Sequence, residues 1–181
     1  MENKYLHLII LIIIISSIIG GYYLYKQNSN DEFYNNYEMQ NNATYNATKQ
    51  TNVVLSGVFT SIISSNGTSS NINQSLENAK ENISLALNYD QKMLENAKTS
   101  KQKEFVKVLT LQTKTIMKYI DLLDELKNSQ KDHTKTKEIL SKIDETRNQT
   151  INYQTELEKI KNSDSELKKR INEINKKSEN N

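Results

Sequence analysis

The fold is decided by the stretch ILSKIDETRNQTINYQTELEKIKNSDSELKKRINEI, residues 139–174. Seam positions recur through it in steps of four and three without interruption, which is the heptad spacing of a coiled coil. In order they hold Ile139, Ile143, Thr146, Thr150, Tyr153, Leu157, Ile160, Asp164, Leu167, Ile171 and Ile174. This apolar seam is narrow and its flanks are charged. It predicts one long helix, at 132–177, that coils against a helical partner or a second copy of the chain.

Three seam positions are polar: Thr146, Thr150 and Asp164. They are either weak points of the coiled coil or residues that specify its register and partner. Ser163-x-x-Glu166 has the form of a capping box, which offers a place where a helix could restart.

Two shorter amphipathic segments precede the seam. The pentapeptide Leu-Glu-Asn-Ala-Lys occurs at 76–80 and again at 94–98. This spacing of 18 residues equals five turns at 3.6 residues per turn, so both copies are expected on one helix face. The predicted stripe on that face is Leu76, Ala79, Ile83, Leu87, Asp90, Leu94 and Ala97.

The segment at 105–126 is the most apolar of the tail. Its apolar face is broad, which indicates contact with more than one neighbouring element. The residues of this face are Phe105, Leu109, Ile116, Tyr119, Leu123 and Leu126, flanked by Val108, Ile120 and Leu122.

A possible break lies between these two segments. Thr99-x-x-Gln102 has the form of a capping box, which would give an antiparallel hairpin of helices at 72–98 and 101–127, each about 40 Å long. No Gly or Pro enforces that break, so one continuous helix through 127 stays open. The C-terminal helix, at roughly 69 Å, would overhang the hairpin unless it bends near Asn162, pairs with a helix at 52–63 or meets another chain.

The N-terminal segment from Tyr5 to Tyr25 has no charged residue between Lys4 and Lys26. As a helix it would be roughly 31 Å long, which matches the thickness of the hydrocarbon core of a bilayer. We expect an uncleaved transmembrane anchor at 5–25; the alternative is a cleaved signal peptide. A short N-terminal head before a long tail favours an extracytoplasmic tail.

Six Asn-x-Ser/Thr sequons in the tail bear on glycosylation. They begin at Asn42, Asn46, Asn66, Asn73, Asn82 and Asn148. In so Asn-rich a chain most of them are expected by chance, so they do not decide the orientation.

Composition excludes several classes of chemistry. The chain of 181 residues has no Cys, no Pro and no Trp, so it has no disulfide and no Cys-ligated metal. His7 lies in the apolar segment, and His133, beside Asp132, is interpreted as a solvated loop residue. No histidine motif of a metal site and no Gly-rich phosphate loop is present. We therefore predict no catalytic, cofactor-binding or metal-binding residue.

Charged clusters have plain interpretations as helix surface. Asp121, Asp124 and Glu125 lie near Lys118 and Lys127, and local ion pairs are expected there rather than a divalent-cation site. A basic tip near the C-terminus could touch anionic polymers, but its interspersed acidic residues and the lack of aromatic interleaving speak against nucleic acid. The tip comprises Lys168, Lys169, Arg170, Lys176 and Lys177.

Together these patterns predict an all-α protein with an N-terminal transmembrane helix and a bundle of three to four long helices that ends in a coiled-coil helix. The expected parts are a signal anchor at 1–26, a polar stalk or weak helix at 27–50 and a helical bundle at 51–181. The expected role is non-enzymatic: protein–protein or cell-envelope contacts at the cell membrane, with self-association or a helical partner through 139–174. The alternative is an extracytoplasmic ligand-binding sensor or accessory bundle that acts through a membrane partner, with the face at 105–126 lining a pocket. A tail inside the cell would instead make a cytoplasmic tether.

Overall fold

The computed structural model describes residues 31–58, 60, 70–129 and 132–179. In this part of the chain all regular secondary structure is helical, which confirms the predicted all-α class. The first helix covers 31–58 and is followed by α2 (Ser70–Asn96), α3 (Ser100–Asn128), α4 (His133–Asn162) and α5 (Ser165–Glu179).

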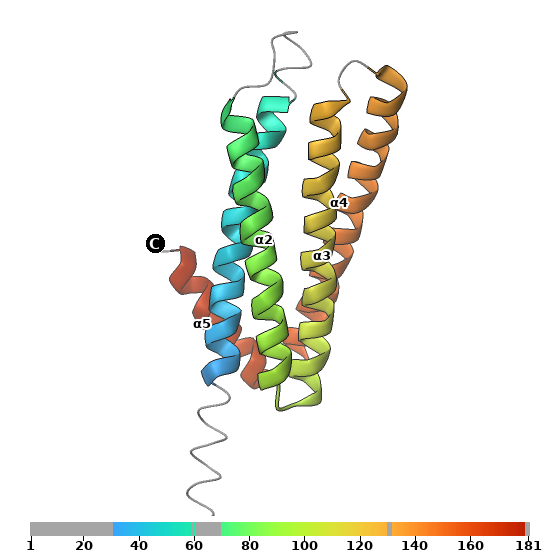
Figure 1. The fold of residues 1–181 in the computed structure, drawn as a ribbon. Helices are drawn as coiled ribbons and strands as arrows, with labels where there is room; N and C mark the ends of the chain where they lie inside the picture. Colours follow the sequence, from blue (N-terminus) through green and yellow to red (C-terminus); the bar gives the residue numbers. More distant parts are fainter. Residues whose placement is uncertain (1–30, 59, 61–69, 130–131, 180–181) are drawn as a thin grey trace, which may run out of the picture.

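The first four helices alternate in direction along one bundle axis (Figure 1). The short helix α5 lies across the end of the bundle at which the helix 31–58 begins. The predicted anchor at 5–25 falls outside the described residues. Among the helices that the structure describes, none combines the length and the apolar character needed to cross a membrane.

The segment expected as a stalk or weak helix, 27–50, is helical from residue 31 onward. The helix passes through the expected boundary at 50/51 without a break. Apart from Tyr34, which directly follows Phe33, its buried positions recur at steps of three and four residues from this segment to residue 58. The buried residues are Phe33, Tyr34, Tyr37, Gln40, Ala43, Ala47, Thr51, Val54 and Val58. The first helix is therefore a full member of the bundle.

The junction between α2 and α3 is the predicted capping box. The backbone N–H of Gln102 donates to Thr99 Oγ1 at 3.0 Å, and the backbone N–H of Thr99 donates to Gln102 Oε1 at 3.1 Å. These reciprocal bonds satisfy donors that a helix start would otherwise leave unpaired. The hairpin is confirmed, and the alternative of one continuous helix is wrong.

Most of the stripe predicted on α2 is buried, namely Leu76, Ala79, Ile83, Asp90 and Ala97. Leu94, the equivalent of Leu76 in the second pentapeptide, is the exception and is 42% exposed. Ala86 and Met93 are buried in addition and keep a heptad step. At 3.5 residues per turn, 18 residues turn about 50° past five full turns, so the two pentapeptides share the core face only in part.

The long helix predicted at 132–177 is two helices, because the chain breaks at Ser163 and Asp164. The break lies next to Asn162, where the sequence left a bend open. Asp164 Oδ1 accepts hydrogen bonds from the backbone N–H groups of Glu166 and Leu167, each at 3.0 Å. A carboxylate at this position satisfies the first donors of α5 and favours the positive end of its dipole. The polar seam position at Asp164 is thus a helix cap.

The heptad seam is buried inside its own chain on both sides of this break. Eight of its positions are buried: Ile139, Ile143, Thr146, Leu157, Ile160, Leu167, Ile171 and Ile174. In this fold the chain itself covers these eight side chains.

Polar contacts tie α5 to the start of the helix 31–58. Arg170 Nη2 lies 3.0 Å from Asp31 Oδ1, and its guanidinium group stacks over the Tyr34 ring at 4.9 Å. The Tyr37 hydroxyl donates to Asn175 Oδ1 at 3.3 Å. Part of the predicted basic tip therefore serves contacts within the chain.

The core consists of two apolar clusters, one in each half of the bundle. The first joins side chains such as Val54, Ile83 and Leu123 from four helices. The second joins Phe33, Met93, Phe105 and residues of α4 and α5, among them Ile171. Polar side chains lie between the clusters, and the candidate site is built on them.

Replacement of Asp164 by Ala tests the cap of α5. The variant leaves two backbone donors without their acceptor, and we expect the free energy of unfolding to fall by about 1 kcal/mol. Urea unfolding followed by circular dichroism measures this loss. Lys169→Ala, an exposed change on the same helix, is the control and is expected to change stability by less than about 0.5 kcal/mol. Equal effects of the two substitutions would contradict the capping role.

Candidate functional site

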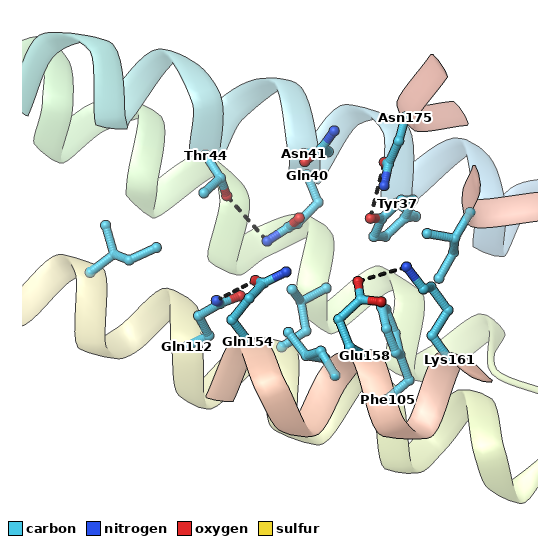
Figure 2. A pocket seen from close by; sticks show the side chains of 14 residues that line it. Tyr37, Gln40, Asn41, Thr44, Phe105, Gln112, Gln154, Glu158, Lys161 and Asn175 are labelled. Carbon is cyan, nitrogen blue, oxygen red and sulfur yellow. Dashed lines mark hydrogen bonds and ion pairs between the residues drawn. The ribbon is translucent and has the colours of Figure 1, made fainter. Parts of the chain in front are cut away.

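A cavity of about 200 Å³ lies between the helix 31–58, α3, α4 and α5 (Figure 2). Five carboxamide side chains line it: Gln40, Asn41, Gln112, Gln154 and Asn175. We call it the carboxamide cavity. It lies where the two apolar clusters of the core meet, and α5 reaches it only because the chain turns back at Ser163 and Asp164.

The carboxamides are held partly by one another and partly by hydroxyl groups. Gln112 Nε2 donates to Gln154 Oε1 at 2.9 Å, across from α3 to α4. Gln40 Nε2 lies 3.2 Å from Thr44 Oγ1 and 3.2 Å from Thr113 Oγ1. An amide group carries two donors and an acceptor with two lone pairs, so these contacts leave hydrogen-bonding capacity for a ligand.

The charged groups of the cavity neutralise each other. Lys161 Nζ lies 2.6 Å from Glu158 Oε1, one turn earlier on α4, and Figure 2 shows this pair at one side of the cavity. The Lys161 side chain is only 11% exposed. A buried ammonium group is tolerated when it is paired, so the cavity presents little net charge.

Part of the cavity wall is the apolar face predicted at 105–126. Phe105, Leu109 and Ile116 all line the cavity. The same helix packs against both α2 and α4, as the breadth of this face predicted. Tyr119, which belongs to the same predicted face, lies outside this cavity.

The Tyr37 hydroxyl stands at the α5 side of the cavity. Burial raises its pKa to about 12, against the opposing effect of its hydrogen bond to Asn175. The phenol is therefore protonated at neutral pH and acts as a donor.

A buried carboxyl group lies behind the cavity. Asp90 of α2 is 1% exposed, and neither of its oxygens accepts a hydrogen bond from the residues that the structure describes. It lies beside Thr113, whose own hydroxyl donates to Leu109 O at 2.9 Å. Gln40, Thr113 and Asp90 thus form a polar layer across three helices.

Burial controls the protonation of Asp90. It raises the pKa of the carboxyl group to about 7, while the Thr113 hydroxyl and the Lys114 charge oppose the rise. A carboxylate in an apolar environment without donors favours the neutral form. Asp90 was placed correctly on the buried stripe of α2, but its chemistry was not predicted.

His133, which was expected in a solvated loop, is exposed as predicted but belongs to a helix. It is the first residue of α4. Its neighbour Asp132 is the N-cap of that helix and accepts from the backbone N–H of Lys135 at 3.0 Å.

The carboxylates near the end of α3 form ion pairs, as predicted. Asp124 lies 2.8 Å from Lys80 Nζ and 2.9 Å from Lys127 Nζ, and Lys80 also reaches Asp121 at 3.5 Å. Burial works against ionisation of Asp124, but these ammonium groups outweigh it and lower its pKa. Among the described residues, no group of three or more acidic or histidine side chains is placed to hold a metal ion.

Sequence reasoning missed the residues that define the cavity. Gln40 and Tyr37 occupy heptad positions of the first helix, and this spacing could have indicated that they face the core. Because their side chains are polar or amphipathic, the sequence shows no apolar stripe before residue 52. Asn175 could not be found, because only the reversal of α5 brings it to the cavity.

Comparison with protein family models, with curated proteins and with solved structures finds no match to this chain. The functional argument therefore rests on the geometry and chemistry of the bundle.

Replacement of Asp90 by Asn tests the buried carboxyl group. Because the folded protein holds this proton up to about pH 7 and the unfolded chain releases it near pH 4, stability should fall as pH rises between these values. We expect Asp90→Asn to flatten this slope and to stabilise the protein at pH 8 by about 1–3 kcal/mol.

Urea unfolding at pH 5 and pH 8 measures both effects. Glu77→Gln, which removes an exposed carboxylate from the same helix, is the matched control and should keep the slope of the parent chain. A parent protein that is equally stable at both pH values would contradict the assignment.

Proposed function

We propose that the protein is a membrane-anchored helical bundle without catalytic activity, and that it binds a small, neutral, polar ligand in the carboxamide cavity. In this proposal the segment 5–25 is the membrane anchor, and the bundle lies on the extracytoplasmic side of the membrane. This is the ligand-binding role that the sequence left as the alternative to a coiled-coil interaction protein.

The observation that supports the proposal is the lining of the cavity. Five carboxamides from four helices converge on one space, and the ion pair found among its described lining residues joins Glu158 and Lys161, one turn apart on α4. Such a lining can satisfy both donors and acceptors of a ligand but offers little to a net charge. Hydroxyl-rich or amide-bearing molecules have the matching chemistry.

The size of the cavity limits the ligand further. A volume of about 200 Å³ is below the roughly 300–1,000 Å³ of pockets that hold drug-sized molecules. The ligand unit is therefore about the size of one sugar ring or one amino-acid residue. Phe105, Leu109 and Ile116 give its apolar face a surface to contact.

The position of the cavity suggests how binding could be communicated. The helix 31–58 and α5 both line it, and both meet again at the ion pair between Asp31 and Arg170. A ligand that bridges these helices would hold α5 against the part of the chain that follows the proposed anchor. Any signal would then pass to a partner in the membrane.

Interaction through the seam at 139–174 is less well supported. The seam residues are buried inside the bundle, so a coiled coil with another chain would first require α4 and α5 to leave it. Exposure of that much apolar surface costs free energy in proportion to the area.

Self-association separates the two roles. We expect the tail, residues 27–181, to keep the same helicity and the same molar mass over a hundredfold range of concentration, because its seam is covered within one chain. Circular dichroism and light scattering make the measurement. Helicity and mass that rise together with concentration would favour the coiled-coil role instead.

Ligand binding is tested by calorimetry of the tail with a small panel of sugars. We expect N-acetylglucosamine or glucose to bind, and glucuronate and glucosamine to bind at least several-fold more weakly because of their charge. Gln154→Ala and Asn175→Ala should each weaken the binding about 5- to 20-fold, the cost of one or two lost hydrogen bonds.

Gln91→Ala provides the matched control, since it removes an exposed carboxamide from α2, outside the cavity. Thermal unfolding of each variant checks that the fold is kept. Failure of every neutral sugar to bind, or equal binding by the Gln91 and Gln154 variants, would overturn the proposal in this form.

A further inference from the structure

A second cavity, of about 310 Å³, opens between the helix 31–58, α3 and α4. It shares Ile116 with the carboxamide cavity, but its chemistry differs. We call it the Arg147 cavity after the residue that decides its character.

The hydroxyl groups on its walls are already used. Thr48, Thr51 and Thr150 line the cavity, and each donates to the backbone oxygen four residues earlier on its own helix, at 2.9, 2.7 and 3.0 Å. Their methyl groups remain for contact with a ligand. Ile116 and Ile151 add apolar surface, and Ile151 is 54% exposed.

Three polar side chains in the cavity have no hydrogen-bond or ion-pair partner among the residues that the structure describes. They are the guanidinium group of Arg147, the phenol of Tyr119 and the carboxamide of Asn52. Burial raises the pKa of Tyr119, the charge of Arg147 lowers it by less, and Asp144 adds a smaller rise, so the phenol keeps its proton at neutral pH. The cavity thus offers one positive charge and two neutral donors beside an apolar wall.

Arg147 differs from the other cations of the bundle. The chain has only two arginines, and the second, Arg170, is fixed between Asp31 and the ring of Tyr34. Asp144, one turn before Arg147 on α4, acts electrostatically on Tyr119, but no ion pair within 4 Å joins Arg147 to an acidic side chain among the described residues. The guanidinium group is therefore available to an external anion.

We propose that the Arg147 cavity binds an amphipathic monocarboxylate, with its carboxylate on Arg147 and its apolar part against Ile116, Ile151 and the threonine methyl groups. The planar guanidinium group can donate two parallel hydrogen bonds to a carboxylate, and this geometry is not open to Lys. The phenol of Tyr119 provides a further donor to the same group. This site is independent of the carboxamide cavity and of the ligand proposed for it.

Charge balance favours a carboxylate over a phosphate. The lining contains one cation, Arg147, and the neutral donors Tyr119 and Asn52, which together match a single negative charge. A phosphate monoester carries nearly two negative charges at neutral pH, and its second charge would face the cavity without a partner. The apolar wall also gives no advantage to a small inorganic anion.

Hexanoate is a suitable probe, with hexanol and hexylamine as its neutral and cationic counterparts of equal chain length. The full 181-residue chain is placed in phosphatidylcholine nanodiscs, and binding is measured by saturation-transfer NMR with empty nanodiscs subtracted. We expect hexanoate to bind at least tenfold more tightly than either counterpart.

Variants assign the binding to this cavity. Arg147→Gln should weaken hexanoate at least tenfold, Arg147→Lys should weaken it by a smaller factor, and Tyr119→Phe should weaken it about two- to fivefold. Lys159→Gln removes one positive charge from the exposed surface of α4, outside the cavity, and should leave the affinity unchanged. Arg147 is itself exposed, so its replacements are expected to fold, and circular dichroism checks this.

Two results would overturn the proposal. One is equal binding of hexanoate by the parent chain and the Arg147→Gln variant. The other is binding of hexanol or hexylamine as tight as that of hexanoate, which would show an unselective apolar surface.

Discussion

The reversal of the chain at Ser163 and Asp164 is the constraint on which the rest of the structure depends. Without it, α4 and α5 would be one helix that projects beyond the bundle with an apolar seam exposed. With it, the second half of the seam packs against the start of the helix 31–58. The cap at Asp164 stabilises the start of α5 locally. The burial of Leu167, Ile171 and Ile174 makes the larger contribution to the stability of this helix. The seam residues therefore complete the core of their own chain.

The middle of the bundle differs from its two ends in the polarity of its buried side chains. Apolar side chains fill both ends, but Gln40, Thr113 and Asp90 occupy the layer between them. Buried polar groups in such a layer cost free energy when they are unpaired, and they also penalise helices that shift along one another. The carboxamide cavity includes Gln40 of this layer. The Arg147 cavity shares Ile116 with it and extends into the half of the bundle that contains Val54 and Leu123. Incomplete packing therefore begins at the polar layer and continues into one half of the bundle.

The sequence predicted those features that depend on local chemistry. The capping box at Thr99 and Gln102 and the ion pair between Asp124 and Lys127 follow from near neighbours along the chain. The breadth of the face at 105–126 follows from its own apolar pattern. Predictions failed where the outcome depended on tertiary geometry. The repeat at 76–80 and 94–98 shares one face only in part, because Leu94 is exposed in packed helices that keep a heptad register. The sequence predicted only a stalk or weak helix at 27–50, because amide, hydroxyl and aromatic side chains occupy several core positions of the first helix.

The division of the core has a consequence for the way in which the protein loses its structure. Each half of the bundle has its own apolar cluster, and the layer between them contributes little hydrophobic stabilisation. Cooperative units of unfolding tend to coincide with such separately packed regions. The end that contains α5 is held partly by a short helix of 15 residues, so we expect it to open first while the opposite end stays folded. Amide hydrogen exchange in this protein would then show two levels of protection rather than one, with the boundary between them near Gln40 and Thr113.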